Sequence, residues 1–123
     1  MKLFYYLFLL ISITSCSHEN NVNRDQISPE YPGGDAEMIN FIVNNFNYPE
    51  YSIENNEQGT IIVQFIISKD GKIKDTKIVQ SISKLLDYEA LRIINKMPKW
   101  KPGEQLGEKV EVRYTLPIYA RIN

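Results

Sequence analysis

The pattern of hydrophobic and polar positions predicts a β-hairpin over residues 59–80, and the other elements are arranged around it. Residues 60–68 are rich in Ile, Val and Phe, which pack well on a pleated sheet. Apolar side chains fall on both faces of this stretch, as is typical of a strand in the middle of a sheet. Asp70 and Gly71 supply the turn, because glycine tolerates the positive φ that a tight hairpin needs. Residues 73–80 return with a more polar pattern, which indicates a strand nearer an edge.

The stretch before the hairpin predicts a helix over residues 36–46. Apolar side chains recur there at helical spacing, so one side of the helix is expected to face the core. The positions on that side are Ile39, Ile42, Val43 and Phe46. Asp35 is expected to cap the helix, and Pro49 ends it, because the residue before a proline avoids helical angles. Residues 51–58 are polar and are expected to hold one irregular helical turn.

A second helix is predicted after the hairpin, over residues 86–97. Ser83 and Asp87 are the candidate caps, and Pro98 ends the helix. The apolar positions that should face the core are Leu86, Ala90, Ile93, Ile94 and Met97. Trp100 follows in a turn-rich segment and is expected to anchor the core or a seam between elements, with an additional role in a contact surface as the alternative.

The last predicted strand covers residues 109–116, where apolar and polar side chains alternate. Val110, Val112, Tyr114 and Leu116 face one way, and Glu111, Arg113 and Thr115 face the other. Such alternation is typical of a half-buried strand. Pro117 follows directly, and proline is confined to edge strands or strand ends. This strand is therefore expected to lie at a sheet edge with unpaired backbone groups.

Together these elements predict an α+β domain of two layers. If the first strand of the hairpin lies between the other two strands, the sheet order is 2-1-3 and all neighbours are antiparallel. The second strand, the second helix and the last strand then form a right-handed crossover. Both helices are expected to cover the same face of this three-stranded sheet.

The N-terminus has the pattern of a bacterial lipoprotein signal. Residues 1–15 combine a lysine with a short apolar run, which is well below the roughly 20 residues that a membrane-spanning helix needs. Cys16 follows an aliphatic and two small residues, as in a lipobox, so we expect cleavage before it and acylation of its sulfur. A plain secretory signal with a chance cysteine is the alternative. Ser17 is not the aspartate that retains many lipoproteins at the inner membrane, so the outer membrane is favoured.

The next segment is expected to be a tether and the remainder a single domain. Residues 16–30 comprise the acylated cysteine and a polar stretch with no periodicity, which is typical of a flexible chain. This tether would reach at most roughly 50 Å. The folded domain is expected over residues 31–123.

Charge and composition exclude several functions. The formal net charge is −1, so no basic surface favours nucleic acid. The chain has one histidine, and it lies in a polar stretch, which argues against a histidine metal site and against a Ser-His-Asp triad. The carboxylates Asp70, Asp75, Asp87 and Glu89 are explained by the turn, a polar strand face and the first turn of a helix. We therefore expect no enzyme activity and no cofactor.

A set of residues along the chain resembles the C-terminal domain family of TonB energy transducers. The residues that carry the resemblance are Tyr48, Pro49, Gly59, Phe65, Asp70, Gly71, Trp100, Pro102 and Gly103. The segment Tyr31-Pro32-Gly33-Gly34 with its helix is similar to the version common in Bacteroidetes-type envelope proteins. The resemblance covers residues 31–123.

The resemblance implies a periplasmic binding module linked to transmembrane transport. Domains of that family hold an extended peptide, the TonB box of an outer-membrane transporter, as a strand beside the third strand of the sheet. Carried over, the binding strand is Val110, Glu111, Val112, Arg113, Tyr114, Thr115 and Leu116. A lipid anchor and a short tether lack the spanning helix and long spacer of a transducer, so binding is expected without energy transduction. Because exposed edges also pair with copies of themselves, a self-associating structural lipoprotein, such as a homodimer, is the alternative.

Overall fold

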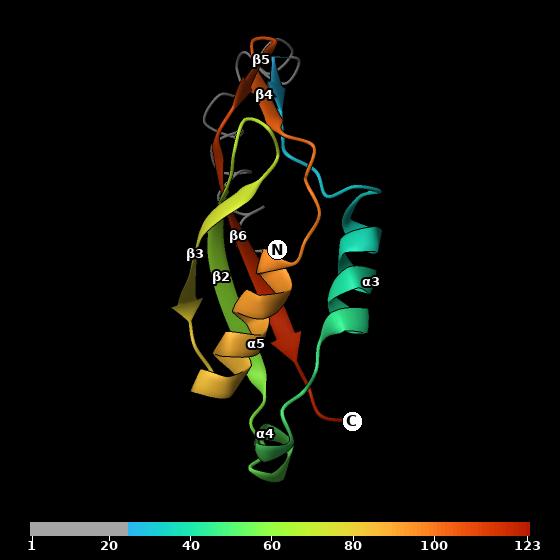
Figure 1. Cartoon of the computed structure of the whole chain (residues 1–123), viewed down its shortest axis with the longest axis vertical. Coiled ribbons are helices and arrows are strands. Elements are labelled where there is room, and N and C mark those ends of the chain that lie inside the picture. The colour runs from blue at the N-terminus through green and yellow to red at the C-terminus, as the bar shows by residue number, and fades with distance from the viewer. Residues whose placement is uncertain (1–24) are drawn as a thin grey trace, which may run out of the picture.

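The computed structural model describes residues 25–123, so the expected signal segment and Cys16 lie outside the described residues. The helices are α3 (Asp35–Asn45), α4 (Glu50–Glu54) and α5 (Lys84–Asn95). The strands are β1 (Gln26–Ile27), β2 (Gly59–Ile67), β3 (Ile73–Gln80), β4 (Gly103–Gln105), β5 (Glu108–Val110) and β6 (Val112–Ala120). Figure 1 shows β2, β3 and β6 as the long strands, with α5 and α3 beside them.

The main sheet has the order β3-β2-β6, and both pairs are antiparallel. This confirms the predicted order and the central place of β2. The hairpin turn is closed by a bond from the Gly71 N–H to the Ser68 carbonyl at 2.9 Å, and the φ of Gly71 is +86°. Glycine is favoured there because other residues rarely adopt a left-handed backbone.

The core lies on one face of this sheet. Its strand residues are Ile61, Val63, Phe65, Ile67, Tyr114, Leu116, Ile118 and Ala120, all of them buried. Helix α5 packs on β2 and β3 and buries Leu86, Ala90, Ile93 and Ile94, as its periodicity predicted. Ser83 is its cap and accepts a hydrogen bond from the Leu86 N–H at 3.3 Å. Asp87, the other candidate, instead accepts a bond from the Ile82 N–H.

Helix α3 departs from the predicted packing. Of its residues only Met38 is fully buried, whereas Ile39 is 50% exposed and Val43 is 68% exposed. Because α5 already covers β2 and β3, α3 has only the outer strand β6 to pack against, and it buries a narrow side (Figure 1). The expected cap is also wrong, since Asp35 is the first helical residue and Gly34 occupies the cap position without a side-chain bond. The single turn expected before the hairpin is confirmed as α4.

The last strand is longer than predicted at one end and broken at the other. Val110 lies in β5 and Glu111 lies between the strands, so the continuous strand 109–116 is wrong. Pro117 does not end β6, which continues to Ala120. Pro117 lies opposite Ile62 within an unbroken register, which an edge strand tolerates when the missing N–H would point away from its neighbour.

A second small sheet, with the order β1-β4-β5, was not predicted. Gln26 pairs with Gln105, and Glu30 forms a bridge with Lys101. The expected flexible tether is therefore wrong for its C-terminal end, which is folded against the β4–β5 hairpin. Strands of two or three residues are too short to show any periodicity in the sequence.

Candidate peptide-binding edge

The edge predicted from the sequence is strand β6, which lies at one side of the main sheet. Val112 to Leu116 lie in it, and its pairing with β2 runs without interruption from Gly59 opposite Ala120 to Ile67 opposite Val112. A straight, regular strand leaves a row of unpaired backbone groups along its outer side. β6 therefore presents a regular template to an additional strand.

Strand β3 forms the opposite edge and is much less regular. Its register with β2 shifts between Ile62 and Val63 and again between Gln64 and Ile66. Asp75 in this strand has a φ of +53°, which is unusual for a residue other than glycine. Bulges and charged side chains are devices that protect an edge from pairing. The two edges thus differ, and β6 is the one suited to accept a strand.

Pro117 defines which backbone groups of β6 point outwards. A proline inside a paired strand has no N–H to donate, so position 117 must direct its backbone away from β2. Backbone direction alternates along an antiparallel strand. The residues that offer an outward N–H and carbonyl are therefore Arg113, Thr115 and Tyr119, while Pro117 offers only a carbonyl.

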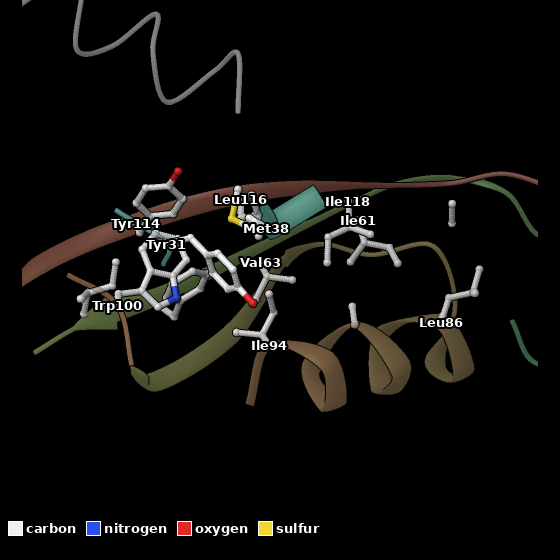
Figure 2. Close-up of a cluster of buried hydrophobic side chains, with 14 residues drawn as sticks. Tyr31, Met38, Ile61, Val63, Leu86, Ile94, Trp100, Tyr114, Leu116 and Ile118 are labelled. Carbon is white, nitrogen blue, oxygen red and sulfur yellow. The ribbon is translucent and has the colours of Figure 1, made fainter. Parts of the chain in front are cut away.

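An aromatic cluster anchors the start of β6. The rings of Trp100 and Tyr114 lie 4.9 Å apart at 65°, and the rings of Phe65 and Tyr114 stack at 5.6 Å. Tyr31 meets Trp100 edge-on at 5.8 Å. Figure 2 shows Tyr31, Trp100 and Tyr114 grouped at one end of the core. Such ring contacts add to the apolar burial and hold this end of the strand in place.

Two motif glycines allow the close approach of the Trp100 segment. The Trp100 N–H donates to the Gly71 carbonyl at 2.9 Å, and a Cβ on Gly71 would lie 2.0 Å from the Trp100 carbonyl oxygen. A Cβ on Gly103, which follows Pro102, would lie 2.7 Å from a methyl group of Val112. The hairpin turn and the first residue of β6 therefore both pack against the segment from Trp100 to Gly103. These contacts require glycine at positions 71 and 103, because a Cβ at either position would clash.

The other motif residues position the chain before β2. The Tyr48 hydroxyl donates a hydrogen bond to the Glu57 carbonyl, and Pro49 precedes the first residue of α4. Burial, with a smaller contribution from Glu57, raises the pKa of Tyr48. Gly59 begins β2 with a φ of +147°. The motif residues discussed above thus hold the fold together. None of them lies at an outward-facing position of β6.

A buried ion pair joins the end of α3 to α5. Glu89 accepts two bonds from Arg92, at 2.8 and 2.6 Å, and one from the Asn47 N–H at 2.6 Å. Arg92 also donates to the Asn45 carbonyl at 2.8 Å. Burial tends to raise the pKa of Glu89, but the bonds from Arg92 and Asn47 outweigh it, so the net pKa is lowered. The interpretation of Glu89 as a carboxylate in the first turn of the helix is wrong, because α5 begins at Lys84 and Glu89 is a buried residue further along it. Its spacing of three from Arg92 was a signal for the pair.

Glu111 has a structural contact at the break between β5 and β6. Its carboxylate lies 2.5 Å from the Lys74 amine on β3, and both side chains are about half exposed. The hydrogen bond to Glu111 raises the pKa of Lys74. This pair links β3 to the residue just before β6, so the Glu111 side chain is directed towards β3 and not towards the free edge.

An apolar groove of about 290 Å³ lies between α3 and β6. Its lining residues are Met38, Ile39, Ile42, Val43, Leu116, Pro117, Ile118 and Tyr119. Sequence reasoning missed this groove because it placed Ile39 and Val43 in the core. Within residues 25–123, no group of His, Cys, Asp or Glu is arranged to hold a metal ion, and no helix is long and apolar enough to cross a membrane.

The comparisons with known proteins agree with this fold. The model of the family described as Gram-negative bacterial TonB protein C-terminal matches residues 44–120. The chain belongs to this family. No curated protein matches the sequence. As a TonB C-terminal domain, the chain has its core strands β2, β3 and β6 and its helix α5 inside the matched region, whereas α3 lies almost entirely before it.

Solved TonB domains share the architecture. An NMR solution structure of the Helicobacter pylori TonB C-terminal domain has a TM-score of 0.54 and 24% identity, covering 75% of this chain and 87% of that one. A shorter fragment of the same domain has a TM-score of 0.51 and 22% identity, covering 72% of this chain and 95% of that one. A solution NMR structure of the Pseudomonas aeruginosa TonB C-terminal domain has a TM-score of 0.49 and 26% identity, covering 63% of this chain and 78% of that one. The two Helicobacter structures support the α+β fold described above.

Proposed function

We propose that this protein is an envelope binding module that holds an extended peptide of another envelope protein as an additional strand beside β6. The observation that carries the proposal is the contrast between the two sheet edges. β6 pairs in one unbroken register and directs backbone groups outwards, whereas β3 is interrupted by bulges. Strand addition is a common way to recognise a peptide, because main-chain hydrogen bonds supply affinity without requiring one sequence.

Membership of the TonB C-terminal family supports a partner in the cell envelope. Domains of this family are interaction modules and not enzymes, and the partner that the resemblance favours is the N-terminal segment of a TonB-dependent outer-membrane transporter. The proposal includes a lipid anchor at Cys16 on the periplasmic side, with the outer membrane favoured. Metabolic labelling with an alkyne fatty acid tests the anchor: wild type is expected to incorporate label and Cys16→Ser is expected to lose it.

The proposed binding is tested by photo-crosslinking in cells from position 113, whose side chain is exposed at the free edge. We expect capture of the N-terminal segment of an outer-membrane transporter, identified by mass spectrometry. Thr115→Pro removes an outward N–H and should abolish capture, whereas the matched control Thr115→Val keeps that N–H and should preserve it. Pro117→Ala restores an outward donor and should increase capture.

The folded state of each variant is checked by circular dichroism on the purified protein. Full capture by a folded Thr115→Pro variant would show that the partner does not add to this edge. Capture of only a second copy of the chain would instead support edge pairing between copies and contradict the proposed partner.

A further inference from the structure

The groove between α3 and β6 lies directly beside the free edge, and we propose that it selects the side chains of the added peptide. The structure assigns to it a peptide with aliphatic or aromatic side chains at two positions separated by one residue. This inference rests on the strand addition proposed above and goes beyond it, because backbone pairing alone would not distinguish one sequence from another.

The geometry of the strand places two side chains of the peptide at this groove. Leu116 and Ile118 are buried on the face of β6 that carries α3. An added strand lies about 4.8 Å from its neighbour, and residues directly opposite each other share a face of the sheet. The peptide residues opposite Leu116 and Ile118 therefore point towards α3, and the residue between them points to the other face. The groove volume of about 290 Å³ provides the space for both.

The helical wall of the groove is apolar and uncovered. Ile39 and Val43 lie four residues apart on α3 and are 50% and 68% exposed. Residues at this spacing form one continuous strip on a helix. Ile42 is half-buried and lines the same groove. This strip of aliphatic side chains lies beside an unpaired strand edge. An extended peptide can form hydrogen bonds with the edge through its backbone and contact the strip through its apolar side chains, so the surface fits a peptide of that kind.

The distribution of charge also favours this occupant over a polar or basic peptide. None of the residues that line the groove is charged. Arg113 near the start of β6 and Arg121 just after its end are both exposed, and residues 112–121 include no carboxylate. Neither arginine forms a salt bridge with the described residues. A peptide with an uncharged apolar centre and acidic flanks complements this edge.

The helical wall of the groove lies outside the segment that the family model matches. The family model matches from residue 44, whereas the groove residues on α3 are Met38, Ile39, Ile42 and Val43. The contacts between Arg92 and Asn45, and between Glu89 and Asn47, fix the C-terminal end of α3 against α5. The wall is therefore held at a defined distance from the edge.

The test uses the full-length chain, purified from cell envelopes, and a library of random heptapeptides displayed on phage. We expect the selected peptides to carry apolar residues at two alternate positions. A synthetic peptide of the selected sequence is then compared with one in which both apolar residues are replaced by serine. The serine peptide should bind at least roughly tenfold more weakly to wild type.

Variants separate the groove from the edge. Ile39→Asp and Val43→Asp place a carboxylate in the apolar wall and should reduce affinity for the selected peptide by roughly tenfold or more. Ile53→Asp is the matched control, because Ile53 is 46% exposed on α4 and does not line the groove. It should leave the affinity unchanged. Thr115→Pro should abolish binding of both peptides.

The outcomes distinguish the two proposals. If Thr115→Pro abolishes binding but the two α3 variants bind like wild type, the groove has no selective role and only strand addition stands. If the selected peptides show no alternation of apolar residues, the inference is likewise overturned. If binding survives Thr115→Pro, or if no peptide is selected, both the strand addition and the groove are refuted.

Discussion

The contact between the hairpin turn and the Trp100 segment leads to a prediction that can be worked out in numbers. Gly71 has a φ of +86°, and a Cβ there would lie 2.0 Å from the Trp100 carbonyl oxygen. A left-handed backbone costs a residue other than glycine about 1–2 kcal/mol. Relief of the clash moves the Trp100 backbone and weakens its hydrogen bond to Gly71, which adds about 0.5–1.5 kcal/mol. Gly71→Ala should therefore destabilise the domain by about 1.5–3.5 kcal/mol.

Gly107 provides the matched control for this prediction. Its φ is +80°, close to that of Gly71, but a Cβ there would meet nothing within 4 Å. Gly107→Ala should incur only the backbone cost of about 1–2 kcal/mol. The difference between the two variants isolates the close approach of Trp100. Urea unfolding, followed by circular dichroism and tryptophan fluorescence, measures both free energies of unfolding.

The comparison has a clear negative result. Each kcal/mol corresponds to about 4–8 °C of melting temperature for a domain of this size, so the difference is measurable. Equal losses in the two variants would mean that the backbone near Trp100 yields freely, and the tight packing of the turn on this segment would be refuted. A Gly71→Ala variant as stable as wild type would also refute the argument from the left-handed backbone.

Three further predictions concern the two ion pairs and the buried Trp100. Glu89→Gln should lower the free energy of unfolding at neutral pH by roughly 1–3 kcal/mol, because it weakens the bonds from Arg92 and from the Asn47 amide. The folded pKa of Glu89 lies below its unfolded value of about 4.3, so its contribution is full above that pH and is lost as the pH falls through the folded pKa. Urea unfolding from neutral to acidic pH should show wild type converging on the variant, and a constant gap would contradict this. Trp100→Ala should lower the free energy of unfolding by about 3–5 kcal/mol in the same assay. A loss no larger than that of a substitution at an exposed position would exclude the role of Trp100 as an anchor. Lys74→Ala should leave the melting temperature unchanged, since the pair with Glu111 is exposed, and a large shift would show that this pair fixes the outer strands.

Much of the main sheet and of α5 could be predicted because their local patterns agree with their final surroundings. The apolar residues on both faces of β2 identified a central strand, and the alternation from Val112 to Leu116 identified β6 as half-buried. Helix α5 faces the sheet with the stripe that its periodicity predicted. In each case the hydrophobic pattern of the segment has one compatible place in a two-layer domain.

The candidate site was predictable only in part. The place of β6 at the edge followed from Pro117 and from the alternation before it, but its length did not, because the sequence does not show on which side a proline directs its backbone. The reading that Pro117 ends the strand was wrong for this reason. The groove could not be found, since it depends on α3 being left outside the area that α5 covers.

The sequence by itself determined the hairpin, the second helix, the edge strand and the motif that indicated a TonB C-terminal domain. These depend on periodicity within one segment and on glycines at fixed turns. Only the tertiary structure decided that Ile39 and Val43 are exposed and that Glu89 is buried in an ion pair. It also decided that Gln26 and Ile27 pair with β4 and that Glu30 forms a bridge with Lys101. The physical reason is that these properties belong to pairs of segments. The burial of a side chain depends on which distant element covers it, and the local sequence pattern does not specify that element.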